Sequence, residues 1–288
     1  MINAPYINEF QLVIDSQSGV RPTANYGASF TPGNNTYGAY ASVLAGASLT
    51  DDAYGIWINV NSVGVSATAT STLATIGIDP AGGTSFTDLI PHLLVSMASV
   101  YANANPSGGV WYYFPLFIKA GTSIGVKGTQ NNAAPVAARC FVRLLCKPSR
   151  PELLRVGSYV RTFGEATATS GGTAVTLGTT SDGAWTQLGS AIAAGDRLWF
   201  WQVAYGADTN TFAASSMLHL DLGIGASSSV LRTPILDVPI FAATTEMTCA
   251  IYNGAYANAV AGDLIFGRAQ DSAAAQANSQ MLAYAVGG

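Results

Sequence analysis

Charged side chains are scarce in this sequence: Asp, Glu, Lys and Arg make up 10% of its 288 residues, against about 25% in an average soluble domain. Apolar residues account for 49%. The small uncharged residues Ala, Gly, Ser and Thr are abundant in place of charged ones. A free-standing enzyme normally keeps a charged surface to remain soluble. The composition therefore favours a chain whose surface is partly covered by partners. A monomer with a Ser/Thr-rich surface is the alternative.

Clustered cations and long apolar runs are also lacking. The twelve Lys and Arg are scattered and the net charge is −4, whereas nucleic-acid binding needs clustered cations to displace counterions. No nucleic-acid partner is expected. The first residues have no basic segment followed by an apolar core, so no signal peptide is predicted. No apolar run reaches about 18 residues, so no membrane partner is expected. These absences predict a protein made in a cytoplasm that stays soluble or assembles there.

Cysteine is too rare for a disulfide framework. Cys140 and Cys146 lie six residues apart in an apolar segment that reads as a strand, which would separate them by about 20 Å. A disulfide needs Cα atoms within about 7 Å. Cys249 is distant in sequence, although it could approach either in space. Buried free thiols are the preferred interpretation.

What the sequence does contain is an internal duplication. The segment "AGTSIGVKGTQ" at 120–130 has an imperfect echo, "AGDLIFGRAQ", at 261–270, and five further blocks align in the same order. The alignment pairs Gly38 with Gly183, Tyr40 with Trp185, Gly77 with Gly223, Ile78 with Ile224, Pro91 with Pro234, Gly121 with Gly262, Ile124 with Ile265 and Lys127 with Arg268. Its last block sets 140–146 beside 280–286. Each unit is domain-sized, so tandem domains are expected rather than a solenoid.

Each copy reads as short β segments separated by Gly, Pro, Asn and Asp. The spacing predicts about eight strands per copy, as in a jelly roll or a related sandwich. The predicted fold is therefore all-β: two tandem jelly-roll-like β-sandwich domains arising from an internal duplication. We expect an N-terminal arm at 1–20, a first sandwich at 21–147, a linker at 148–156 and a second sandwich at 157–288.

Inside the echoed segment, Gly121 is expected to turn the chain into a strand. Ile124 and Val126 would then face the core, with Lys127 on the opposite face. Gly262, Ile265 and Arg268 would take the same roles in the second copy. A cation in both copies indicates a salt bridge or a packing contact more than a shared ligand site.

Candidate contact residues are aromatic or apolar. In "LWFWQ" at 198–202, alternation would place Trp199 and Trp201 on one face and Phe200 on the other. The first copy has Ile56 and Ile58 there, which favours a core role, with a subunit interface as the main alternative. Trp185 is a further candidate for an exposed aromatic.

The N-terminal segment "YINEFQLVID" precedes the first repeat block. Phe10, Leu12 and Ile14 alternate in it and could pair with a strand edge of a neighbour. With equal weight, the segment could close its own domain.

Motifs for catalysis, phosphate binding or metal binding are weak or lacking. His219 and Asp221 are two residues apart on a predicted strand, but the first copy has Leu73 and Thr75 there, so a surface pair is favoured over a general base or metal ligands. No phosphate-binding loop, no GxSxG element and no convincing carboxylate pair is found. No enzyme activity, no catalytic residue, no cofactor and no metal is predicted.

The order "GAY…L", "TIGID" or "LGIG", "IP" and then "FPLFIKAGTSIGVK" resembles a module common in structural proteins of tailed bacteriophages. There an "IPAGTRI"-like strand is followed by a base; this chain has Lys119 where that module has Pro, and its second copy is degenerate. The resemblance implies a virion component and no catalytic residue.

The expected function is therefore a non-enzymatic virion protein that decorates the capsid or contributes to the neck, tail or baseplate. It would contact other virion proteins and copies of itself as a homo-oligomer. A carbohydrate- or receptor-binding module of a phage tail is the alternative, with exposed Trp185, Trp199 or Trp201 around a shallow groove.

Overall fold

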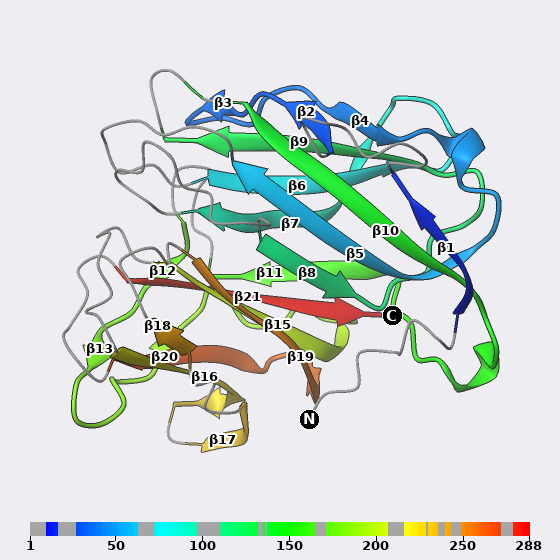
Figure 1. Ribbon diagram of the computed structural model, residues 1–288. Coiled ribbons are helices and arrows are strands. Elements are labelled where there is room, and N and C mark those ends of the chain that lie inside the picture. The colour runs from blue at the N-terminus through cyan, green and yellow to red at the C-terminus, as the bar shows by residue number, and fades with distance from the viewer. Residues whose placement is uncertain are drawn as a thin grey trace.

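The computed structural model describes residues 10–16, 27–62, 72–96, 110–131, 135, 137–164, 171–206, 216–228, 230–235, 240–242, 249–271 and 279–288. Within these ranges the regular elements are β-strands and two 3-10 turns, η2 (Gly46–Ser48) and η3 (Pro151–Leu153). The strands form four sheets, two in each half of the chain, so the predicted pair of jelly-roll-like sandwiches is confirmed. Figure 1 shows the first sandwich, blue to green, above the second.

The first sandwich consists of sheets I and II. Sheet I has the order β1-β10-β5-β8, with β2 also pairing with β10. Its strands are β1 (Phe10–Asp15), β2 (Ala28–Phe30), β5 (Ala53–Ser62), β8 (Val110–Phe114) and β10 (Ala138–Pro148). Sheet II has the order β3-β9-β6-β7, with β4 also pairing with β9. Its strands are β3 (Gly33–Asn34), β4 (Ala41–Leu44), β6 (Thr72–Asp79), β7 (Thr87–Ser96) and β9 (Ser123–Gln130).

The second sandwich, sheets III and IV, repeats this topology. Sheet III has the order β11-β21-β15-β19, with β12 on β21, and sheet IV has the order β13-β20-β16-β17, with β14 on β20 and β18 on β16. The strands of sheet III are β11 (Tyr159–Phe163), β12 (Thr173–Ala174), β15 (Arg197–Gly206), β19 (Cys249–Val260) and β21 (Gln280–Gly287). Those of sheet IV are β13 (Leu177–Gly178), β14 (Thr186–Gln187), β16 (Ser216–Ser227), β17 (Val230–Ile235), β18 (Ile240–Ala242) and β20 (Leu264–Asp271). Even the parallel pairs β3–β9 and β13–β20 correspond.

The echoed segment performs the same task in both copies. Gly121 and Gly262 adopt φ of 82° and 87°, a left-handed conformation that favours glycine, and each precedes a strand, β9 or β20. Ile124 and Ile265 are fully buried. Lys127 lies opposite Thr75, and Arg268 lies opposite Asp221, in matching register. The predicted equivalence of the two segments is confirmed.

The aligned last block, in contrast, is wrong by one residue. Gly27 lies against the backbone of Cys140, and Gly172 lies against the backbone of Met281. Cys140 therefore corresponds to Met281 and not to Gln280. Because side chains alternate along a strand, this shift exchanges the core and outer faces of β21.

The pairing of Pro91 with Pro234 is also wrong. Pro234 lies opposite Gly223, whereas the residue opposite Gly77 is Asp88. A register shift in the pairing of β6 with β7 displaces Pro91 from that position.

The expected alternation of Trp199, Phe200 and Trp201 is broken by a β-bulge between Leu198 and Phe200. Trp199 and Phe200 both belong to the cluster shared with the first sandwich, whereas Trp201 lies in the core of the second. An extra residue at a bulge turns the side chains beyond it to the other face. Val203 lies opposite β21 at the position where Ile58 lies opposite β10. Two residues before each of them, Trp201 therefore takes the place of Ile56.

The N-terminal segment closes its own domain. β1 pairs antiparallel with β10 over Phe10–Asp15, and β11 pairs with β21 in the same manner. The segment thus has a counterpart in the second copy, which the sequence alignment did not reveal.

The two sandwiches share one hydrophobic core. The larger buried cluster contains residues of the first sandwich together with Val160, Trp199, Phe200, Ala204, Leu282, Tyr284 and Val286 of the second. These side chains come from the outer face of sheet III, which covers the edge strands β7 and β8 of the first sandwich. An edge covered in this way is protected from pairing with other chains.

Candidate functional site

The outer face of sheet I carries many apolar side chains beside the bonded pair Asp15 and Arg143. Residues directly opposite in an antiparallel pair point to the same side, and the register places Val13 with Leu145, Trp57 with Tyr113, and Asn59 with both Trp111 and Phe141. Their neighbours Ile58 and Val142 fill the core. An antiparallel sheet with one face in solvent usually carries polar residues there. Leu145, Phe141 and Tyr113 on the outer face are only 0%, 1% and 2% exposed, so much of this face is covered within the chain itself.

Aromatic rings continue from this face across the junction of the sandwiches. We call them the aromatic band: Trp57, Trp111, Tyr113, Phe141, Trp199, Phe200 and Tyr256. Ring centroids are 4.9 Å apart for Trp57–Tyr113, 6.4 Å for Trp57–Trp111, 6.1 Å for Trp111–Phe141, 6.0 Å for Tyr113–Phe200, 5.4 Å for Phe200–Tyr256 and 6.0 Å for Trp199–Tyr256. Trp111 is 38% exposed and Tyr256 57%. The band therefore presents aromatic surface at both ends.

Cations flank the band. The Arg155 guanidinium lies 4.5 Å from the Trp199 ring centroid and donates to Asn258 Oδ1 at 3.3 Å. Arg143 lies over Phe141 and donates twice to the Asp15 carboxylate, at 2.7 and 3.1 Å. These contacts hold the rings in place through cation–π attraction. The buried indole N–H of Trp57 has no acceptor in the described part of the chain.

The phenols of the band are not acid–base groups. Burial, followed by the charge of Tyr256, raises the pKa of Tyr113. Burial also raises the pKa of Tyr256, although the nearby Arg155 charge lowers it in part. Both side chains stay neutral at physiological pH, which suits a contact surface.

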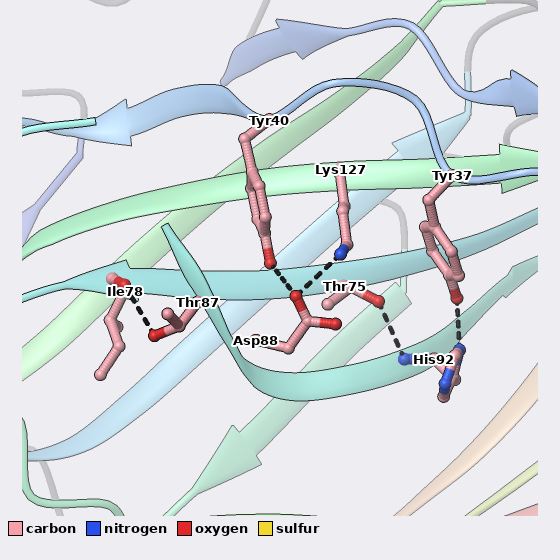
Figure 2. A network of polar contacts seen from close by, with 8 residues as sticks. All are labelled: Tyr37, Tyr40, Thr75, Ile78, Thr87, Asp88, His92 and Lys127. Atoms are coloured by element: carbon pink, nitrogen blue, oxygen red, sulfur yellow. Dashed lines mark hydrogen bonds and ion pairs between the residues drawn. The ribbon is translucent and has the colours of Figure 1, made fainter. Parts of the chain in front are cut away.

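A second feature is the cation cluster on the outer face of sheet II, drawn in Figure 2. Lys127 Nζ lies 2.7 Å from Asp88 Oδ1, and the Tyr40 hydroxyl donates to the same oxygen at 2.6 Å. The ammonium is also 4.8 Å from the centroid of the Tyr40 ring and 5.2 Å from that of Tyr37. Beside it, the Tyr37 hydroxyl bonds with Nδ1 of His92. The cluster fastens the segment before β4 to the sheet.

The second sandwich has the equivalent cluster. Arg268 bonds with Asp221 and Asp182, each at 2.7 Å, and its guanidinium lies 4.4 Å from the centroid of Trp185. Trp185 thus stands where Tyr40 stands. The two cations make both a salt bridge and a packing contact, as the sequence favoured.

The predicted contact residues lie in several places. Phe10 is buried, while Leu12 and Ile14 are half-buried against the first core. Trp185 is half-buried under Arg268. Trp199 is almost covered, and Trp201 is fully buried and donates its indole N–H to the carbonyl of Ala257. Phe10 and Trp199 belong to the same large buried cluster, whereas Trp201 belongs to the core of the second sandwich.

The sequence reasoning missed Trp57, Trp111 and Tyr256. For Trp57 the signal was present, because "YGIWINVN" alternates Ile56 and Ile58 with Trp57 and so sends it to the opposite face. For Tyr256 no signal existed, since its position depends on how the sandwiches meet.

The remaining polar side chains of interest lie in the second sandwich and at its surface. Among the described residues no group of three or more His, Cys, Asp or Glu side chains gathers as a metal site. Asp221, half of the predicted His219–Asp221 pair, is bound to Arg268. A hollow of about 280 Å³ is lined by residues that include Phe163 and the bonded pair Arg161 and Asp196. In the same described ranges, no helix is long and apolar enough to cross a membrane.

Comparison with known proteins gives only distant structural likeness. No family model and no curated protein matches the sequence. Among solved structures, a peptide-N(4)-(N-acetyl-β-D-glucosaminyl) asparagine amidase aligns over 90% of this chain and 95% of its own, with 6% identity and a TM-score of 0.35. The tandem CBM22 domain of Paenibacillus barcinonensis Xyn10C aligns over 85% and 80%, with 10% identity and a TM-score of 0.22. An infectious bursal disease virus structure (Gt strain) aligns over 83% and 57%, with 11% identity and a TM-score of 0.26. Scores this low carry no conclusion about function.

Proposed function

We propose that this protein is a non-enzymatic structural component of a bacteriophage virion, acting through protein–protein contacts in the capsid, neck, tail or baseplate. The observation that carries the proposal is the aromatic band, which spans both sandwiches and leaves Trp111 38% and Tyr256 57% exposed. Exposed aromatic side chains are enriched at interaction sites. The resemblance of "FPLFIKAGTSIGVK" to phage structural modules supports a virion as its location.

The shared core supports the same role. Because the sandwiches bury a common cluster, the chain presents its surfaces as one body, which suits a building block. Low charge also favours a chain covered by partners. Other virion proteins and further copies of the chain are the proposed partners.

The direct test is the composition of particles. Virions from a culture carrying this gene would be purified on a density gradient and analysed by mass spectrometry. We expect the chain in a fixed ratio to the major capsid protein, with a phage replication enzyme as the negative control. Its presence in the lysate but absence from the particles would overturn the proposal.

A carbohydrate- or receptor-binding role is the second candidate, favoured by one observation. The Tyr256 ring is 57% exposed and stacks on Trp199, with Arg155 and Asn258 beside it. An exposed ring flanked by polar groups can stack on a sugar. Glycan-array binding that Tyr256→Ala abolishes, with an unchanged unfolding midpoint, would support this role. An empty array would remove it.

A further inference from the structure

The strand β1 lies at one margin of sheet I (Figure 1), where its register with β10 shows no shift. Directly after β1, the N–H of Ser16 donates to the carbonyl of Val142 at 2.9 Å, and the N–H of Val142 donates to Ser16 Oγ at 3.1 Å. In an antiparallel pair, only alternate residues of a strand bond with the neighbouring strand. The backbone groups of Gln11, Val13 and Asp15 therefore point away from β10.

This outer edge of β1 is open. In the described part of the chain, β10 is the one strand that pairs with β1, and no backbone or side-chain group there bonds with the outward-pointing N–H and C=O groups. Gln11 is exposed, while Leu12, Val13 and Ile14 are half-buried. An open edge of this kind is a template on which another strand can pair.

The edge also lacks the usual protection against such pairing. Proteins block edge strands with Lys or other charged side chains, proline, bulges or short strands. The six residues of β1, "FQLVID", include no Lys, Arg or Pro. Their one charged side chain, Asp15, is already bonded to Arg143 on the neighbouring strand.

The equivalent edge strand of the second sandwich, β11, does carry a protecting charge. Val13 and Val160 occupy matching positions opposite β10 and β21, so Arg161 stands in β11 where Ile14 stands in β1. The Arg161 side chain is 51% exposed and bonds with Asp196. The two edges therefore differ in the feature that discourages pairing, and β1 is the one without it.

The free edge of β1 is complementary to itself. When two antiparallel copies meet with Val13 opposite Val13, Gln11 of each copy lies opposite Asp15 of the other. The outward-pointing N–H and C=O groups of the two copies then face one another. Leu12 lies opposite Ile14 of the other copy, so half-buried side chains that pack against the first core meet across the contact. The Gln11 amide faces a carboxylate, which accepts hydrogen bonds.

We propose that β1 pairs antiparallel with β1 of a second copy of this chain, across a two-fold axis at Val13. The two copies of sheet I then form one continuous sheet. Such a contact is isologous and gives a closed dimer. Its affinity comes from main-chain hydrogen bonds, and its register comes from the side chains. The inference rests on the proposed assembly role and names the surface through which one copy contacts another.

The first test is proximity. The two Val13 Cα atoms would lie about 5.5 Å apart, whereas the two Gln11 residues would be about 13 Å apart along the strands. In a Cys249→Ser background, a short bifunctional thiol reagent should therefore join Val13→Cys chains into a covalent dimer. Gln11→Cys is the matched control, because this position is more exposed but should not be joined. Equal joining of both variants, or of neither, would overturn the proposal.

The second test is the solution mass of the full chain, measured by size-exclusion chromatography with light scattering over a wide concentration range. We expect a dimer that dissociates on dilution. Gln11→Glu places like charges opposite each other and should raise the dissociation constant about threefold or more, whereas Gln11→Lys should lower it by a similar factor. Because Gln11 is exposed, neither change should alter the unfolding midpoint. Equal dissociation constants for the two variants would contradict this register.

A proline variant tests the main-chain bonds. Val13→Pro removes an N–H that points away from β10, a position at which edge strands tolerate proline, so the chain should stay folded and become monomeric. If this variant unfolds, the Cys and Glu variants still decide the question. A monomer at every concentration, or an open series of larger species, would overturn the inference. Neither result would touch the proposed function, because incorporation into particles is measured separately.

Discussion

The hydroxyl oxygen of Tyr284 accepts a 2.9 Å hydrogen bond from the backbone N–H of Leu94, 190 positions earlier in the chain. The same hydroxyl donates to the carbonyl of His92 at 3.0 Å. One side chain of the second sandwich therefore serves two backbone groups of β7, the edge strand of the first. Burial of such groups is favourable only when they are hydrogen-bonded.

Replacing Tyr284 by Phe should destabilise the whole chain. The change keeps the ring but removes both hydrogen bonds at a buried site, which costs about 1–3 kcal/mol. The measurement is the free energy of unfolding in urea. Tyr256→Phe is the control, because its ring is 57% exposed. A loss no larger than the control's would mean that water replaces the hydroxyl.

The two cation clusters should differ in strength although they are equivalent in position. Arg268→Met removes one ion-pair partner from each of two carboxylates, one of which, Asp221, is 8% exposed, and should cost about 2–3 kcal/mol. Lys127→Met leaves Asp88 half in solvent, at 47% exposure, and should cost below about 1 kcal/mol. Urea unfolding of both variants checks the order. Equal losses would argue against burial as the cause.

The Lys127 cluster should also make stability depend on pH in acid. Burial alone would raise the pKa of Asp88, but hydrogen bonds from Lys127 and Tyr40, with the Lys127 charge, together lower that pKa from its ordinary 3.8. A lowered folded-state pKa gives stability that is present above the unfolded value and lost as pH falls through the folded one. Asp88→Asn should therefore flatten the loss of stability below about pH 4. Urea midpoints measured across that range, compared with Asp52→Asn, provide the check; parallel curves for Asp88→Asn and the unmodified protein would refute it.

The repeat explains why so much of the fold was predictable. Gly38 and Gly183 each donate their N–H to the matching carbonyl, of Gly128 and of Ala269, and only glycine avoids the backbone atoms that a Cβ would meet at 2.5 and 2.0 Å. Such backbone constraints remain visible in the sequence after the surrounding side chains have changed. The turns at Gly121 and Gly262 and the strands that follow them were therefore placed correctly.

The features that the sequence did not predict have one common cause: each depends on contacts between strands that are distant in the sequence. The bulge before Phe200 and the shift of β21 by one residue leave no local signal, because Trp199, Phe200 and Trp201 are all apolar and alternation cannot be read from them. The aromatic band likewise forms only when Tyr113 of one sandwich meets Phe200 of the other. The sequence could predict which residues are aromatic but not which of them would remain at the surface.

The cysteines give a prediction that tests the cores themselves. Burial raises the pKa of the Cys140 thiol, and burial together with the charges of Asp51 and Asp52 raises the pKa of Cys146 from 9.0 to about 11. Because the thiolate is the reactive form, a rise of this size lowers its population at neutral pH about a hundredfold. In a Cys249→Ser background, both thiols should therefore react slowly with an alkylating reagent in the native protein and fast after unfolding in urea. The rate for Cys146 should increase as the pH approaches 11, while that for Cys140 should increase only on unfolding. Rapid labelling of Cys140 in the folded protein would contradict this, because it would show that the first core opens readily under native conditions.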